Sequence, residues 1–166
     1  MKYDFNDGNG PVAAHKHPNG GGWVADSAYV DDTAYVGPEA KVYGNAVVKD
    51  YAHLCTAAKV YGNAIVACGA RLWGRAQVFG WAVVEDCATV SGNARVFGDA
   101  RVSGYASVSG DAQVSGRASV QEDAEIFGQA KIYGRAVVYG EAVLGGTASV
   151  AGRVWFSSVA SDGAFE

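Results

Sequence analysis

The chain has 166 residues, of which 49% are hydrophobic and 18% are charged, and its formal net charge at pH 7 is −4. This length fits one domain, and the acidic balance gives no reason to expect duplex nucleic acid as a partner. The sequence has no apolar run long enough to cross a membrane, and its start, MKYDFNDGNG, lacks the basic-then-apolar pattern of a signal peptide. We therefore expect a cytoplasmic protein that has no membrane partner.

Residues 1–23 precede the regular pattern described below and are predicted to form an N-terminal cap segment. We expect Trp23 and Phe5 to cover the open edge of the structure that follows, because the ends of repeat proteins need such a cover. His15 and His17 form a His-x-His pair, which allows the alternative of a metal or catalytic site. Two histidines without a nearby third ligand favour the cap, so we expect no metal and no cofactor.

Residues 24–153 repeat with a period of six. Every sixth residue from Val24 to Val150 is aliphatic, and these 22 positions hold 17 Val, three Leu and two Ile. The 21 positions that follow four residues later, from Ala28 to Ala148, are all Ala. Since no insertion breaks the register, the pattern indicates a solenoid of short parallel strands, with these aliphatic and Ala positions pointing inward.

Three hexapeptides make one turn, because the segment AKVYGN at residues 40–45 recurs identically at residues 58–63, a spacing of 18. The first series of hexapeptides starts at Ala40, the second at Ala28 and the third at Ala34. Stacking the three series in register predicts an all-β triangular prism of about seven 18-residue turns. Gly fills 14 of the 19 corner positions from Gly44 to Gly152, where a turn needs positive φ or close backbone approach.

The unbroken hexapeptide of residues 24–153 resembles the left-handed β-helix proteins of the hexapeptide-repeat family. It is most similar to uncharacterised bacterial and phage members that are labelled putative transferases. The resemblance implies a left-handed parallel β-helix, which periodicity alone does not determine, and it implies a homotrimer. One departure is that Gly stands two residues after the aliphatic residue here, whereas the family's usual pattern places it directly after. Residues 154–166 are predicted to form a C-terminal cap or tail, closed by Trp155 and Phe156.

The outward residues of the first series form a cationic and an aromatic column. The candidate ligand-binding residues in these columns and at the adjoining corner are Lys41, Tyr43, Lys59, Tyr61, Phe79, Arg95, Phe97, Lys131, Tyr133 and Arg135. One interpretation is that the rings stack on one another and stabilise successive turns. The other is a binding strip for an anionic planar molecule such as a nucleotide, since rings next to cations can stack planar groups and hold phosphates.

The second series carries an excess of carboxylates and an outward apolar stripe that a lone soluble prism would rarely expose. The candidate oligomer-interface residues in this stripe are Val47, Ile65, Val83 and Val137. A cyclic trimer that packs the basic first side against the acidic second side would cover the stripe and pair the charges. We therefore expect a homotrimer.

The family resemblance also implies an acyltransferase that uses an acyl-CoA or acyl-carrier thioester. Such relatives carry a catalytic His on a loop that interrupts the prism, and this chain has no insertion of that kind. In this alternative His53, or His15 and His17 from a neighbouring cap, would act as the general base. We favour a non-catalytic trimeric binding or scaffold protein, possessing no catalytic residues, and keep the acyltransferase as the alternative hypothesis.

Overall fold

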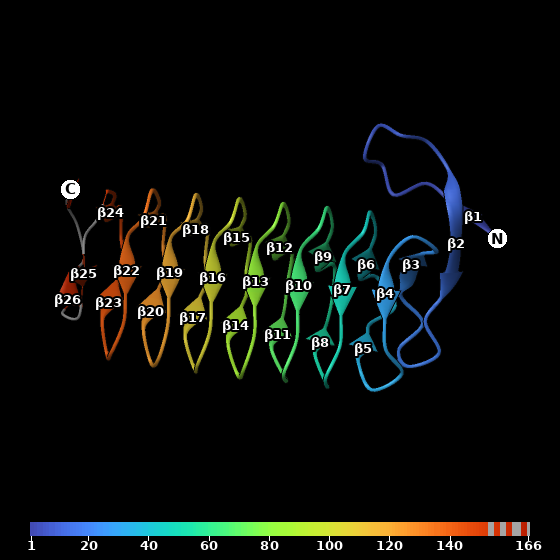
Figure 1. Cartoon of the computed structure of the whole chain (residues 1–166), viewed down its shortest axis with the longest axis horizontal. Helices are drawn as coiled ribbons and strands as arrows, with labels where there is room; N and C mark the ends of the chain where they lie inside the picture. Colours follow the sequence, from blue (N-terminus) through green and yellow to red (C-terminus); the bar gives the residue numbers. More distant parts are fainter. Residues whose placement is uncertain (153–154, 157–158, 161–163, 166) are drawn as a thin grey trace.

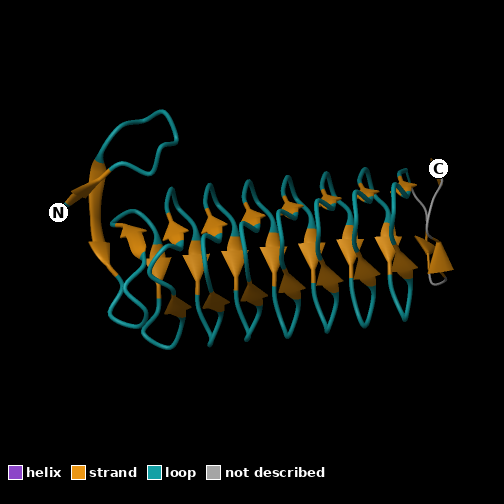
Figure 2. Cartoon of the chain, turned by 180° about the vertical axis from the view of Figure 1, so that it is seen from behind, coloured by secondary structure: helices purple, strands orange, loops and turns teal. Residues whose placement is uncertain are grey.

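The computed structural model describes residues 1–152, 155–156, 159–160 and 164–165, with side chains described up to residue 152. In these residues the chain forms short β-strands and no helix, hence none that is long and apolar enough to cross a membrane (Figure 2). The strands stack into an elongated three-sided solenoid with the two termini at opposite ends (Figure 1). The predicted all-β parallel solenoid is confirmed.

The first sheet contains the seven strands of the first hexapeptide series and four more at its ends. In spatial order its 11 strands are β1 (Lys2–Tyr3), β2 (Val12–Lys16), β3 (Trp23–Ala25), β6 (Lys41–Val42), β9 (Lys59–Val60), β12 (Gln77–Val78), β15 (Arg95–Val96), β18 (Gln113–Val114), β21 (Lys131–Ile132), β24 (Ser149–Val150) and β27 (Ala164–Phe165).

The second and third sheets have eight strands each, and all of their strands pair in parallel. The second sheet contains β4 (Tyr29–Val30), β7 (Val47–Val48), β10 (Ile65–Val66), β13 (Val83–Val84), β16 (Arg101–Val102), β19 (Ser119–Val120), β22 (Val137–Val138) and β25 (Trp155–Phe156). The third contains β5 (Tyr35–Val36), β8 (His53–Leu54), β11 (Arg71–Leu72), β14 (Thr89–Val90), β17 (Ser107–Val108), β20 (Glu125–Ile126), β23 (Val143–Leu144) and β26 (Val159–Ala160). The predicted closure of the C-terminal end by the side chains of Trp155 and Phe156 lies outside the described side chains.

Backbone hydrogen bonds join each turn to the next with a constant offset. The N–H of Lys41 donates to the carbonyl of Ala58 at 3.0 Å, and the N–H of Tyr43 donates to the carbonyl of Val60 at 3.0 Å. In both bonds the acceptor lies 17 residues after the donor, and the same offset recurs in the later turns. Each side of the prism must therefore contain the same number of residues in every turn.

The inward residues form one continuous core along the axis. From Ala34 to Val150, the Ala and aliphatic residues of the repeat are buried, with exposures of 0% or 1%. Ala28 and Val30, at the first edge of the second sheet, are only partly buried. Because each turn is one hexapeptide wide on each side, the interior has room for one Val-sized residue per side and for Ala beside each corner.

The corner glycines combine positive φ with close backbone contact, as predicted. At Gly80, φ is 75°, and a Cβ built on this residue would lie 3.0 Å from the nitrogen of Gly98 in the next turn. The stacked backbones cannot separate without breaking a hydrogen bond, since the N–H of Trp81 donates to the Gly98 carbonyl at 2.8 Å. Only glycine satisfies both constraints without strain.

Five corner positions in the same register hold other residues, and all five also have positive φ. They are Asp50, Thr56, Cys68, Asp86 and Glu122, with φ between 53° and 61°. Two of the carboxylates accept hydrogen bonds from the corner N–H of the next turn: Asp86 from Gly104 at 3.1 Å and Glu122 from Gly140 at 2.9 Å. These charge-assisted bonds offset part of the cost of about 1–2 kcal/mol for an L-residue in this conformation.

The N-terminal segment covers two of the three exposed sheet edges. Strand β2 pairs antiparallel with β3, and β1 pairs antiparallel with β2. At the third sheet, the N–H of Val36 donates to the Asn19 carbonyl at 3.0 Å, and the N–H of Gly22 donates to the Val36 carbonyl at 2.9 Å. Figure 1 shows the long loop between β1 and β2 standing away from the prism at this end.

A pair of glycine variants separates corner crowding from backbone conformation. Gly69 has φ of 81°, close to that of Gly80, but a Cβ on Gly69 would lie 3.6 Å from its nearest neighbour, the carbonyl oxygen of Asp86. We expect Gly69→Ala to cost about 1–2 kcal/mol, the conformational strain alone. Gly80→Ala adds a backbone clash and should cost about twice as much or more. Thermal unfolding followed by far-ultraviolet circular dichroism measures both, and equal losses would contradict the crowding argument.

Candidate ligand-binding surface

The outward face of the first sheet carries two parallel columns of side chains. The cation column consists of the first residue of each first-sheet strand from β6 to β21. Its members are Lys41, Lys59, Gln77, Arg95, Gln113 and Lys131. The ring column consists of the residue that follows each of these strands, and its members are Tyr43, Tyr61, Phe79, Phe97, Ser115 and Tyr133. Both columns are straight because the strands pair in register without a bulge.

The first four rings of the ring column form a continuous parallel stack. The centroids of Tyr43 and Tyr61 are 4.9 Å apart, those of Tyr61 and Phe79 are 4.8 Å apart, and those of Phe79 and Phe97 are 5.0 Å apart. The interplanar angles are 1–2°. These distances match the spacing of stacked strands, so the backbone sets the ring separation.

The N-terminal segment extends this stack. Phe5 is buried at 1% exposure and stacks on Tyr43 at 4.9 Å, while Tyr3 contacts Phe5 edge-on and stacks on Trp23 at 4.2 Å. Phe5 thus covers the end of the ring column, whereas the prediction placed it over the open edge of the first turn. Sequence analysis did not include Tyr3 among the important residues, although residues 3 and 5 have the two-residue spacing of outward positions in a strand.

Stacking leaves most of these rings without a free face. Tyr43 lies between Phe5 and Tyr61, Tyr61 between Tyr43 and Phe79, and Phe79 between Tyr61 and Phe97. These three rings offer a ligand only their edges. The self-stacking interpretation therefore describes this half of the ring column, and a planar ligand has no place to insert there.

The cation column is tied to the rings in its first four turns. Lys41 Nζ lies 5.0 Å from the centroid of Tyr3, and the Tyr61 hydroxyl donates to Gln77 Oε1 at 3.2 Å. The Arg95 guanidinium lies 5.1 Å from the centroid of Phe79 and 5.4 Å from that of Phe97. Because these two distances are nearly equal, Arg95 lies beside the pair of rings and leaves the far face of Phe97 uncovered.

Burial in the stack changes the acidity of two phenols. The pKa of Tyr43 is raised to about 12, chiefly by burial and further by the neighbouring Tyr61. Burial also raises the pKa of Tyr61, against the opposing effect of the Arg95 guanidinium beside it. Both phenols are therefore neutral at physiological pH, and the positive charge of the cation column is not compensated by them.

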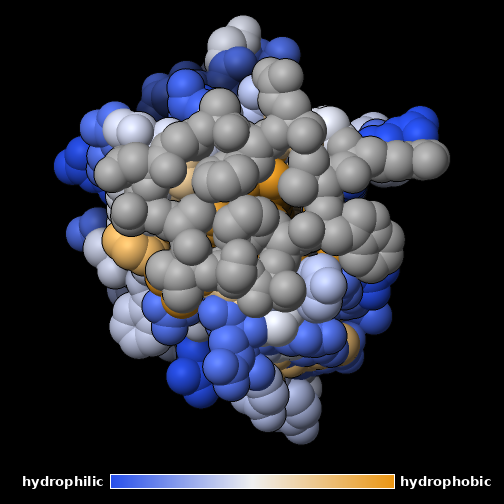
Figure 3. Space-filling view, turned by 90° about the vertical axis from the view of Figure 1, so that its left-hand side faces the viewer, coloured by the Kyte–Doolittle hydropathy of each residue, from blue (hydrophilic) through white to orange (hydrophobic). Residues whose placement is uncertain are grey.

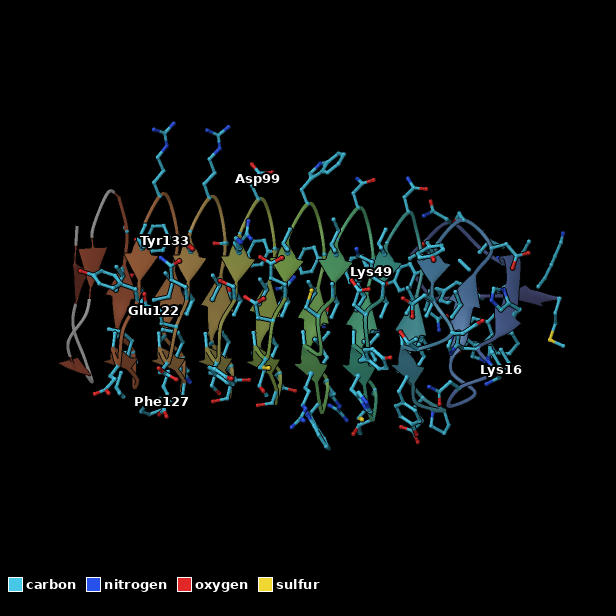
Figure 4. All side chains as sticks on the ribbon, turned by 60° about the horizontal axis from the view of Figure 1, so that its bottom comes forward. Lys16, Lys49, Asp99, Glu122, Phe127 and Tyr133 are labelled. Atoms are coloured by element: carbon cyan, nitrogen blue, oxygen red, sulfur yellow. The ribbon has the colours of Figure 1, made fainter. Side chains whose placement is uncertain are left out.

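The C-terminal half of the surface is different, because the ring column is interrupted at Ser115. Tyr133, Lys131 and Arg135 are exposed, and no ring stacks on Tyr133 among the described side chains. Figure 4 shows Tyr133 on the turns beyond Asp99, toward the C-terminal end. At the corner next to this region, Arg117 Nε lies 3.6 Å from Asp99 Oδ2. Within the described residues, Lys59, Arg95 and Lys131 make no ion pair.

The apolar stripe of the second sheet is shorter than predicted. Tyr29, Val47, Ile65 and Val83 pair in consecutive strands, and the next strand places Arg101 after Val83. Val137 belongs to the same sheet but is separated from the stripe by Arg101 and Ser119. The three valines and Ile65 are half-buried, and Tyr29 is exposed. Val47, Ile65 and Val83 therefore form one patch with Tyr29 over four turns, and Val137 is separate from it.

The acidic residues of the second series lie at the corner that follows this sheet. Some of them are already paired within the chain, since Lys49 Nζ lies 3.2 Å from Asp50 Oδ2 and Arg101 contacts Glu85. Figure 4 separates the three corners, with Asp99 on the basic corner, Glu122 on the acidic corner and Phe127 on the remaining one. The carboxylates of the second series thus gather at one corner, whereas Lys41, Lys59, Arg95 and Lys131 lie on the face of the first sheet. Viewed along the axis from the C-terminal end, the visible rim is mostly hydrophilic (Figure 3).

The three histidines, His15, His17 and His53, do not lie together in a catalytic arrangement. His53 is exposed on the third sheet and stacks on Tyr35, with centroids 5.5 Å apart. His15 Nδ1 lies 2.8 Å from Asp26 Oδ1, whereas His17 is buried and donates from Nδ1 to the Asn19 carbonyl at 3.1 Å. Within the described residues, no three His, Cys, Asp or Glu side chains are grouped to hold a metal ion, and no cavity opens in the surface.

The fold and its residue pattern define a β-solenoid repeat protein. Three segments of the chain, residues 88–104, 94–110 and 130–146, match the repeat described as the YdcK beta solenoid repeat. Each matched segment begins at an inward Ala of the hexapeptide and covers almost one turn. The chain is similar to this repeat in its solenoid turns, and the match concerns the fold. No curated protein matches the chain.

The raised pKa of Tyr43 predicts a loss of stability at high pH. An unfolded tyrosine ionises near pH 10, whereas Tyr43 in the folded protein keeps its proton until about pH 12. The unfolded state therefore releases its proton first, so this stabilisation is complete below pH 10 and is lost between pH 10 and 12. Tyr43→Phe should remove this part of the pH dependence, and melting curves from pH 8 to 12 measure it.

The matched control for this experiment is Tyr105→Phe, because Tyr105 is 71% exposed. We expect it to melt like the wild-type protein at every pH. If Tyr43→Phe and the wild type lose stability in parallel above pH 10, the proposed burial of the Tyr43 phenol in the stack is wrong.

Proposed function

We propose that the protein is a non-catalytic binding solenoid that assembles as a homotrimer and binds a planar anionic ligand, such as a nucleotide, on its first sheet. The observation that carries the proposal is the division of the surface along the axis. In the first four turns the rings are stacked on one another and the second sheet carries its apolar stripe. In the later turns no described ring stacks on Tyr133, and Lys131 and Arg135 are exposed.

The N-terminal turns suit a contact between protomers. The stripe of Tyr29, Val47, Ile65 and Val83 would pack against the first sheet of a neighbour, where the methylene groups of Lys41 and Lys59 can cover apolar side chains while their ammonium groups reach the acidic corner. In a closed ring of three protomers, the first sheet of each protomer would contact the second sheet of its neighbour, so that every first and second sheet takes part in one contact. The stacked rings stiffen this face and present only their edges to the neighbour.

The C-terminal turns suit an anionic ligand. The second sheet of a neighbour would present Arg101 and Ser119 to Gln113 and Lys131 at this level, and these residues are not complementary in charge. The positive charge therefore needs an anion from outside the chain. A phosphate group next to Lys131 and Arg135 would supply it, since charge-assisted bonds to phosphate are the strong hydrogen bonds of such surfaces.

Isothermal titration calorimetry with AMP, GMP, CMP and their 3′,5′-cyclic forms tests the ligand. We expect at least one nucleotide to bind, and Lys131→Ala should weaken its binding about tenfold, which corresponds to about 1.4 kcal/mol. Lys49→Ala is the matched control, because Lys49 lies at the acidic corner and pairs with Asp50. It should leave the affinity unchanged. The absence of binding across the panel would contradict the ligand proposal and leave the assembly proposal standing.

Light scattering coupled to size-exclusion chromatography tests the assembly. The wild-type protein should have the mass of three chains, and Ile65→Glu should convert it to monomers, because a carboxylate would be buried unpaired in an apolar contact. The monomer should keep its β-sheet spectrum, since Ile65 points away from the core. Val143→Glu is the control, since Val143 is outward and half-buried on the third sheet. A monomeric wild type would overturn the trimer.

A further inference from the structure

The ring column has one empty ring position. Residues 97, 115 and 133 occupy equivalent places in three successive turns, as shown by the N–H bonds of Phe97 to Val114, Ser115 to Ile132 and Tyr133 to Val150, at 2.9, 2.8 and 2.9 Å. Ser115 is the only member of the column between Tyr43 and Tyr133 that has no ring. Phe97 and Tyr133 are therefore two strand spacings apart along the axis, about 10 Å.

This separation equals the space that one further ring requires. In the filled part of the column, consecutive centroids lie 4.8–5.0 Å apart. A ring inserted above Ser115 would thus stack on Phe97 at one face and on Tyr133 at the other, at centroid distances that aromatic pairs favour. Arg95 does not lie over the far face of Phe97, because its guanidinium is beside Phe97 and Phe79, at 5.4 and 5.1 Å from their centroids, and no other described ring or cation stacks on that face.

We propose that the gap above Ser115, between Phe97 and Tyr133, is an intercalation slot for the aromatic ring of a bound anion, such as the base of a nucleotide. This inference rests on the proposed function, and it assigns the ligand's planar part to one position. The slot is a gap between neighbouring side chains of one column and not a cavity, since none opens in the surface of the described residues.

The repeat also indicates what lies at the outer edge of an inserted ring. One filled position shows the geometry: the hydroxyl of Tyr61 reaches Gln77, 16 residues later, at 3.2 Å. The same offset from Ser115 leads to Lys131, the equivalent residue of the cation column. A ring in the slot would therefore direct its outer edge toward an ammonium group, which favours a carbonyl, carboxylate or phosphate substituent there.

The small side chain of Ser115 is consistent with a slot that is kept open. Its hydroxyl makes no hydrogen bond to any described residue, nor does the neighbouring amide of Gln113. Both groups can therefore bond to the polar edge of a ligand. In the stacked half of the column, by contrast, Gln77 is engaged by Tyr61.

The test fills the slot with a ring of the protein itself. Ser115→Tyr would complete the column from Phe97 to Tyr133, so we expect a higher melting temperature and a loss of AMP binding of 30-fold or more, about 2 kcal/mol. Ser115→Ala should bind AMP within about twofold of wild type, since it keeps the slot open. Ser109→Tyr is the matched control, because Ser109 holds the same place in the third hexapeptide series and is also half-buried.

The ligands distinguish stacking from charge. Adenosine supplies the ring without the phosphate, and ribose 5-phosphate supplies the phosphate without the ring. We expect AMP to bind at least tenfold more tightly than ribose 5-phosphate, and the base protons of AMP to shift upfield in NMR spectra because they lie between two rings. If AMP binds but Ser115→Tyr leaves its affinity unchanged, the slot is wrong and the proposed function stands. If none of the nucleotides binds the wild-type protein, the slot and the proposed nucleotide binding are both wrong, and the assembly proposal is unaffected.

Discussion

The backbone hydrogen bonds between turns are the constraint on which the rest of the structure depends. Each bond joins a donor to an acceptor 17 residues later, as in the bond from Lys41 to Ala58. One inserted residue would shift every later side chain of that side from the interior to the surface, because side chains alternate along a strand. The uniform six-residue side is thus required by the backbone, and straight columns of outward residues follow from it.

Straight columns turn a sequence pattern into a surface with a fixed period. Any two residues 18 positions apart are neighbours at about 4.8 Å, a distance at which rings stack and like charges repel. Both ring stacking and the proximity of like charges occur in this protein. Phe79 and Phe97 lie at the stacking distance of 5.0 Å, and the neighbouring lysines Lys41 and Lys59 are paired in register despite their equal charge. Surface chemistry in this fold is therefore decided by which residue types are repeated and where the repetition stops.

Much of the fold could be predicted from the sequence, because the inward pattern determines the turn length and the three-sided cross-section, although not the hand of the helix. An aliphatic residue at every sixth position and an Ala four residues later fix the turn length, the core and the corners, and Gly80 has the predicted φ and contacts. The carboxylates that accept corner N–H groups, such as Glu122, could not be predicted, since their partners are identified only when the turns are stacked. The antiparallel direction of strand β2 could not be predicted either, because residues 12–16 lack the repeat that sets the direction of the other strands.

The residues of the candidate surface were predicted from the sequence, but the division of its ring column into stacked and unstacked rings was not. The sequence places Tyr61 and Tyr133 in equivalent positions, and only the structure shows that the first has both faces covered, while no ring among the described side chains covers the second. The cause is local: Ser115 interrupts the stack, and Phe5 closes its other end. The column therefore has a stacked part before Ser115 and an open part after it.

The N-terminal hairpin of β1 and β2 affects whether molecules can stack end to end at high concentration. A stack of identical parallel turns can in principle continue into a second molecule placed end to end, and such growth has no natural limit. At the N-terminal end the incoming turn would meet β1, which after two reversals runs in the same direction as β3 but has only two residues, together with the loop of residues 17–22. Neither offers the three parallel edges that a further turn requires. The hairpin is thus a stop to filament growth at that end, built from the part of the chain that breaks the repeat.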